Sequence, residues 1–260
     1  MYNQSKNTDG CVIATLIRAI NTYLIPYREI LPGVEDVLTQ IPLATMKGNF
    51  CKNNPTIPFS RAEILKTAVC NIRAQTLKAI RECLLSATDE LIWRQDENEY
   101  YAPGSDLSDG YRANNLHAVL IGPSNAKYYH PDFTLGIFLL GPFTLYRDHF
   151  HLAPELYVNL SPRTGWRFQG GEWIDYSAGS LIWNDSNGVH ATRVYDEPFI
   201  SIFSWTRNIN SLCKVFQCAD WKKVEQDKTY KDISATEIQG VFSRAFITAI
   251  SKMTDSSSDK

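Results

Sequence analysis

The sequence has no long hydrophobic run and no excess of positive charge. No window approaches the roughly 20 consecutive apolar residues that a helix needs to cross a bilayer, so a helical membrane protein is excluded and no membrane contact is expected. The formal net charge of −2 leaves no basic footprint, so nucleic acid is not expected as a partner. The polar N-terminus shows no secretory pattern, and we therefore expect a cytoplasmic protein.

Closely spaced cysteine pairs are also missing. The six cysteines are spread through the chain without CxxC spacing, which favours buried thiols in a reducing compartment. No internal repeat is found. Apolar residues make up 44% of the 260 positions, enough to bury a substantial core. These features favour one domain with an appended helical part, and they say nothing of the oligomeric state.

The first hundred residues carry helical periodicity. Apolar residues recur every three to four positions over 12–24, where Pro26 ends the pattern, and a shorter helix is predicted over 34–41. The strongest pattern begins at residue 60 and runs close to 93, with a break expected near Ser86. The N-terminal segment, 1–115, is therefore predicted to be helical.

From residue 116 the pattern changes to that of strands. Seven or eight short runs rich in β-branched and aromatic residues are separated by Gly, Pro, Asn and Asp, which predicts an antiparallel sandwich or small barrel over 116–210. The acidic, turn-rich stretch 96–115 before it is equally compatible with a solvated linker and with a loop that folds over a pocket. The last segment, 211–260, is predicted to contain one amphipathic helix over 235–253.

One stretch of the β region, YRDHFHLAPELY, gathers most of the candidate site residues. If it is extended, the period of two places His149 and His151 on one face and carries the same parity to Glu155 and Tyr157. A further histidine, His190, follows about one hairpin later. Several imidazoles with one carboxylate suit a single divalent transition metal such as Zn, Fe, Mn or Ni. HxH alone is common by chance, but the whole combination is not.

The spacing HxH, three residues, Glu and a late His resembles that of the cupins. Gly141 precedes the first motif, and Ala178-Gly179 lies where the second cupin motif usually has Pro-x-Gly. The resemblance implies a mainly β fold: a cupin double-stranded β-barrel with an N-terminal helical segment and a C-terminal helix.

Within the cupins, the sequence most resembles the dimethylsulfoniopropionate (DMSP) lyases, in detail over about 117–207. Tyr157 follows Glu155 by two residues, Tyr146 precedes His151 by five, and helices precede the barrel, as in that family. The resemblance implies a carbon–sulfur lyase that splits DMSP into dimethyl sulfide and acrylate by β-elimination. Tyr157 would be the base and Tyr146 a second essential tyrosine, and the metal ligands would be His149, His151, Glu155 and His190.

Such a substrate is a small zwitterion whose sulfonium end has no hydrogen-bond donors, so aromatic faces are its natural partners. Candidate substrate-binding residues are Tyr129, Trp183 and Trp205, with Tyr101 if the acidic loop closes over the site. For any one of these residues, packing in the core or barrel is the favoured interpretation, because aromatic residues dominate strand cores.

Three further residues need comment. Tyr146 has the opposite strand parity to His149, so it points inward only if a bend or bulge lies between them, around Arg147-Asp148. The isolated histidines His117 and His130 are interpreted as structural or surface residues.

Other functions share this ligand pattern. An Fe(II)-dependent cupin dioxygenase would differ in needing molecular oxygen, and a sugar-processing isomerase would need clustered basic residues for phosphate. A related cupin acting on another small substrate fits the same pattern, because fold and metal do not fix the substrate. The intact ligand set speaks against a barrel kept only as a small-molecule sensor or binding module.

Overall fold

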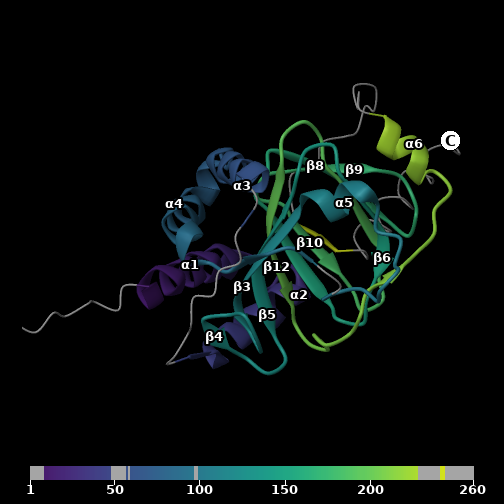
Figure 1. Cartoon of the computed structure of the whole chain (residues 1–260). Coiled ribbons are helices and arrows are strands. Elements are labelled where there is room, and N and C mark those ends of the chain that lie inside the picture. The colour runs from purple at the N-terminus through teal and green to yellow at the C-terminus, as the bar shows by residue number, and fades with distance from the viewer. Residues whose placement is uncertain (1–8, 48–56, 58, 97–98, 228–240, 244–260) are drawn as a thin grey trace, which may run out of the picture.

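A computed structural model of the chain describes residues 9–47, 57, 59–96, 99–227 and 241–243. Figure 1 shows N-terminal helices gathered along one side and strands that close around an interior on the other, with later helices placed against the strands. Within the described residues, no helix is both long and apolar enough to span a membrane.

The helices come mainly from the N-terminal half, as predicted. Helix α1 buries Leu16, Ile20 and Leu24 on one face, which matches the helical period in the sequence. The α-helices are α1 (Asp9–Leu24), α2 (Pro32–Gln40), α3 (Phe59–Cys70), α4 (Lys78–Ala87), α5 (Asp109–Asn114) and α6 (Trp221–Gln226). Short 3-10 helices are η1 (Ile25–Tyr27), η2 (Ile41–Leu43), η3 (Gln75–Leu77) and η4 (Thr88–Glu90).

The strands form two sheets. The larger sheet has the order β1-β4-β3-β5-β12-β7-β10-β14, with β2 paired to β3, and the smaller has the order β13-β6-β11-β8-β9. The longer strands are β3 (Asn115–Gly122), β5 (Thr134–Leu140), β6 (Leu145–Phe150), β7 (Glu155–Asn159), β8 (Arg163–Phe168), β9 (Ile174–Ser177), β10 (Leu181–Asn184), β11 (His190–Arg193) and β12 (Phe199–Trp205). The shorter ones are β1 (Thr45–Met46), β2 (Trp93–Arg94), β4 (Tyr128–Tyr129), β13 (Lys214–Val215) and β14 (Val241–Ser243).

Each face of the larger sheet has its own core. On β12, Ile200 and Ile202 pack with the helices, whereas Phe203 and Trp205 belong to a second, largely aromatic cluster inside the barrel. This alternation follows from the period of two in a strand. The helices therefore cover the outside of the sheet, and the barrel interior is left to the aromatic residues and the candidate site. The expected fold class, a cupin barrel with helices at its N-terminal side and one at its C-terminal side, is confirmed.

Two predicted elements differ from the structure. The long helix has the break expected near Ser86, because α4 ends at Ala87, but it also breaks after Cys70, and this second break turns the chain so that Ile72 and Leu77 both reach the core. The C-terminal helix is α6; most of the helix predicted over 235–253 lies outside the described residues, and 241–243 form β14, parallel to β10. A free edge of the larger sheet accepts this short β-branched and aromatic segment as a strand.

Candidate active site

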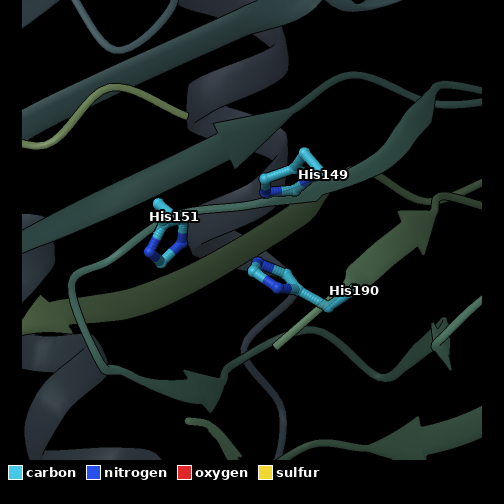
Figure 2. A group of neighbouring side chains, drawn as sticks. All are labelled: His149, His151 and His190. Atoms are coloured by element: carbon cyan, nitrogen blue, oxygen red, sulfur yellow. The ribbon is translucent and has the colours of Figure 1, made fainter. Parts of the chain in front are cut away.

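Three buried histidines meet inside the barrel. One ligand nitrogen from each of His149, His151 and His190 lies within 4.8 Å of the other two. Figure 2 shows the three imidazole rings around one space, with His190 on its own strand. His149 and His190 are directly paired residues of β6 and β11, and His151 follows the end of β6.

Backbone carbonyls orient all three rings in the same way. Nδ1 of His149 lies 2.8 Å from the Arg147 carbonyl oxygen, and Nδ1 of His151 lies 2.7 Å from that of Ala153. Nδ1 of His190 lies 2.9 Å from the carbonyl oxygen of Gly188. A carbonyl only accepts, so each Nδ1–H donates, and in the neutral ring Nε2 keeps its lone pair. The hydrogen bond at Nδ1 leaves Nε2 of each ring as the nitrogen that can bind a cation.

Glu155 completes the group from the other sheet. Its Oε2 lies 3.0 Å from Nε2 of His151 and 3.5 Å from Nε2 of His190. Burial acts to raise the pKa of Glu155, but the interactions with the two histidines outweigh it and hold that pKa well below 4.5. The pKa of His149 is well below 6.5, because of burial and then the neighbouring imidazoles. The site therefore combines a carboxylate with a neutral imidazole at His149.

These donors fit a divalent metal. Nε2 of His190 is buried and has no hydrogen-bond partner, although the Glu155 carboxylate is at ion-pair distance. A cation bound between this nitrogen and the carboxylate oxygen would be a partner for both. Three imidazoles and one carboxylate suit Zn, Fe, Mn or Ni.

Tyr157 lies two residues beyond Glu155 on β7 and is 4% exposed. Burial, followed by the charge of Glu155 and a hydrogen bond to its carboxylate, raises the pKa of Tyr157 well above 10. In the protein without a bound cation, the phenol is therefore protonated. The expected single extended stretch is not seen: the chain turns after Phe150, so Tyr157 and Glu155 reach the site from the larger sheet and His149 reaches it from the smaller one.

Tyr146 points into the same cavity because of a bulge in β6. His149 pairs with His190, but Tyr146 pairs with Thr192, so three steps along β6 match two along β11. The bulge falls at Arg147-Asp148, where the sequence required it. The ring centroids of Tyr146 and His149 are 4.1 Å apart. Tyr146 thus shares the inward side with His149 in spite of its parity.

The described part of the stretch 96–115, residues 96 and 99–115, closes over this cavity rather than forming a solvated linker. The Tyr101 hydroxyl lies 2.7 Å from that of Tyr146, and the Tyr111 ring stacks on the Tyr146 ring with centroids 4.5 Å apart. The hydroxyl of Tyr111 donates to the Asp96 carboxylate at 3.1 Å. The Asp96 carboxylate also accepts a hydrogen bond from the backbone N–H of Glu99 at 3.0 Å. Asp96, at the start of the loop, therefore binds both the Tyr111 side chain and the loop backbone.

Comparisons with known proteins show the family of this chain. The sequence profile of the DMSP lyase family matches residues 44–201, which is more than half of the chain. This chain belongs to the DMSP lyase family. The expected enzyme class, a carbon–sulfur lyase, is thereby confirmed. No curated protein matches the sequence.

Two solved structures of DMSP lyases resemble the fold of this family member. A chain from the crystal structures of the DMSP lyases RdDddP and RnDddQII is 19% identical, with a TM-score of 0.58, and the match covers 80% of this chain and 100% of that one. DddQ from Ruegeria pomeroyi DSS-3 is also 19% identical, with a TM-score of 0.55, over 75% of this chain and 95% of that one. A cupin-like protein from Thermotoga maritima matches 45% of this chain at 12% identity, with a TM-score of 0.38.

Only one of the three aromatic residues suggested for substrate binding in this DMSP lyase family member lines the cavity. Trp205 does, with its ring centroid 4.6 Å from that of His151. Tyr129 is 42% exposed on β4, beneath the ammonium group of Lys47. Trp183 faces the helices, where it packs against Gly33 and donates from its indole nitrogen to Asp185. Strand parity on β10 turns Trp183 away from the barrel interior.

The cavity also contains residues that the sequence did not point to. His117, interpreted from the sequence as structural or surface, is 3% exposed and lines the cavity, where its Nε2 lies 3.3 Å from a Glu99 carboxylate oxygen. Cys213 lines it too, and burial, followed by nearby carboxylates, raises its thiol pKa well above 9.0. His130 lies outside this cavity. No motif spacing links His117 or Cys213 to the HxH stretch, so only the packing of distant segments could reveal them.

The charged side chains near the candidate metal ligands bind other residues of the barrel and not the imidazole rings. Asp148 pairs with Arg167, and Arg193 donates to the Tyr195 hydroxyl at 3.0 Å. The direct orienting groups are the three backbone carbonyls.

Proposed function

We propose that this protein cleaves DMSP to dimethyl sulfide and acrylate by β-elimination, with one divalent metal and Tyr157 as the base. The observation that carries the proposal is the meeting of three imidazole nitrogens and the Glu155 carboxylate beside the Tyr157 phenol, in a chain of the DMSP lyase family. The cavity in which they meet is small and lined mostly by aromatic side chains.

The proposed metal ligands are His149, His151, Glu155 and His190. Each imidazole is already turned by a backbone carbonyl so that Nε2 faces the site. When bound, a divalent ion would supply Lewis acidity, which neutralises the substrate carboxylate. Its positive charge would also lower the pKa of Tyr157, against the burial and the carboxylate charge that raise that pKa.

Tyr157 is proposed to remove the proton from the carbon next to the substrate carboxylate. The phenolate oxygen takes that proton, and the electron pair of the C–H bond becomes the second bond between the α and β carbons. The bond between the β carbon and sulfur breaks, and the sulfur keeps its electron pair. Dimethyl sulfide leaves as a neutral molecule, so the reaction needs no acid at the leaving group.

Tyr146 is the second proposed catalytic tyrosine. Its hydroxyl is held by that of Tyr101 at 2.7 Å, and its ring is held between Tyr111 and His149. This fixes the Tyr146 hydroxyl and ring beside His149. We propose that it donates to the substrate carboxylate and orients the α carbon toward Tyr157.

The sulfonium group is proposed to lie against the aromatic wall. Trp205, Phe203 and Phe138 all line the cavity and offer ring faces to a cation that cannot donate hydrogen bonds. Tyr129 and Trp183 are outside this wall, so the proposal assigns the sulfonium contact to Trp205 and not to them.

Headspace detection of dimethyl sulfide from the purified protein with DMSP tests this function. The wild type loaded with Zn, Fe, Mn or Ni should release dimethyl sulfide, and a chelator-stripped sample and Tyr157→Phe should lose it, by about 10²–10⁴-fold for the loss of a general base. Tyr23→Phe is the matched control, because its hydroxyl donates to the Gly179 carbonyl away from the cavity.

Absence of dimethyl sulfide from each metal-loaded wild-type sample would overturn the assignment of DMSP as the substrate. If instead a substrate is consumed only with Fe(II) and molecular oxygen, the dioxygenase alternative is correct. Full activity in Tyr157→Phe would refute the role of that phenol as base.

A further inference from the structure

A segment near the C-terminus packs against the outer side of the β6 bulge. We call residues 213–226 the C-terminal strap; it contains β13, which pairs with β6, and α6. The backbone N–H of Phe216 donates to the carbonyl oxygen of Asp148 at 2.8 Å. Figure 1 shows α6 lying on the outside of the barrel, on the side of the smaller sheet.

Side chains of the strap bind both bulge residues. The indole nitrogen of Trp221 donates to a carboxylate oxygen of Asp148 at 2.8 Å. Arg147 donates from Nε and Nη2 to the two carboxylate oxygens of Glu225, at 2.8 and 3.0 Å, and its guanidinium lies over the Trp221 ring at 4.8 Å. Each bulge residue therefore has a partner in the strap.

A buried arginine joins the strap to the barrel wall. Arg167 on β8 is 2% exposed and donates from Nε to Asp148 at 2.9 Å and from Nη1 to Asp220 at 2.6 Å. Asp148 is fully buried, so its charge is stabilised by Arg167 and by the Trp221 N–H together. The bulge is thus held from two sides by groups that do not touch the cavity.

The peptide held in this way is the one that orients a candidate metal ligand. The carbonyl oxygen of Arg147 accepts the Nδ1–H of His149 at 2.8 Å. If the bulge relaxed, this carbonyl would move, and the ring could rotate or change its tautomer. We propose that Trp221 and Glu225 are positioning residues, which act through the bulge to keep Nε2 of His149 directed into the site. The proposal rests on the proposed function only in that the site binds a metal.

The first experiment reads the orientation of His149 without metal and without substrate. In Trp221→Phe, one hydrogen bond to Asp148 is lost and the aromatic packing is kept. Long-range ¹H–¹⁵N spectra of the metal-free protein should show His149 as the Nδ1–H tautomer in the wild type and as a mixture of tautomers in Trp221→Phe. Trp93→Phe is the matched control, because Trp93 is equally buried and its indole donates to the Thr88 carbonyl at 2.9 Å, away from the site.

The second experiment measures metal affinity. Zinc should bind Trp221→Phe about tenfold more weakly than the wild type, as for the loss of other groups that orient a ligand. Trp93→Phe should bind zinc within twofold of the wild type, even if both variants melt earlier. Glu225→Gln should weaken zinc binding in the same direction, with Glu197→Gln, which removes the partner of Arg73 at the surface, as its control.

A single Nδ1–H tautomer and unchanged zinc affinity in Trp221→Phe would overturn the proposal and leave the strap as a purely structural element. Neither measurement uses DMSP, so failure of the lyase assignment would leave these results as they are. A wild type that binds no zinc, iron, manganese or nickel would refute the metal site instead, and the tautomer measurement would still decide the role of the strap.

Discussion

Tyr101→Phe tests whether the loop 96–115 takes part in the site. The substitution removes only the hydroxyl that lies 2.7 Å from that of Tyr146. Tyr101 is fully buried and Tyr146 is 7% exposed, so water does not readily replace the lost partner. Leaving a buried hydroxyl short of a hydrogen bond costs about 1–3 kcal/mol.

This cost has two measurable consequences. For a chain of this size, roughly 2 kcal/mol lowers the melting temperature by about 4–8 °C. If the Tyr146 hydroxyl is catalytic and loses its orientation, the same energy appears in the transition state, and kcat/KM for dimethyl sulfide release falls roughly 10- to 100-fold. Most of the loss should be in kcat, because Tyr101 does not line the cavity.

Tyr23→Phe separates the two consequences. The Tyr23 hydroxyl also makes a hydrogen bond of 2.7 Å, to the Gly179 carbonyl, at a part-buried position between a helix and the sheet. Its removal should lower the melting temperature and leave kcat/KM within about twofold of the wild type. Calorimetry and initial-rate kinetics on both variants decide the matter. If Tyr101→Phe keeps full activity, or if both variants lose activity in proportion to their stability, the link from Tyr101 through Tyr146 to catalysis is refuted.

Three further predictions concern pH, the substrate wall and packing. Because the pKa values of His149 and Glu155 are lowered in the folded protein, unfolding takes up a proton on His149 below about pH 6.5 and on Glu155 below about pH 4.5. In urea titrations of the metal-free protein, each group should lower the free energy of unfolding by about 1.4 kcal/mol for each pH unit below that point. A flat profile from pH 7 to 5 would contradict the lowered pKa of His149. Trp205→Phe should raise KM about fivefold, the equivalent of about 1 kcal/mol of cation–π contact, whereas Trp183→Phe should leave KM unchanged. Equal effects of the two substitutions on KM would place the sulfonium group elsewhere. Gly136→Ala would bring a Cβ atom within 2.6 Å of the facing Phe203 ring and 2.7 Å of a backbone oxygen. Chemical denaturation should therefore show a free energy of unfolding that is lower by about 1–3 kcal/mol. An unchanged denaturation midpoint would contradict the close packing behind the cavity.

The sequence was sufficient for the features that depend on local spacing. The helical period of α1 and the alternating strands of the barrel are both properties of neighbouring residues, and both were predicted correctly. The need for a bulge before His149 also followed from parity alone, because Tyr146 could not otherwise reach the inward face. The expected convergence on one extended strand was wrong in detail, since the turn after Phe150 moves Glu155 to the other sheet.

What the sequence by itself determined is the set of side chains spaced closely along the chain: the HxH pair, the glutamate and the tyrosine that follows it. Tertiary structure decided what surrounds them. The closure of the loop that carries Tyr101, the inward position of His117 and the outward position of Trp183 depend on how the sheets and helices pack. Spacing along a chain fixes only which residues share a face of one element, whereas the register and packing between elements choose which of those faces enclose the site.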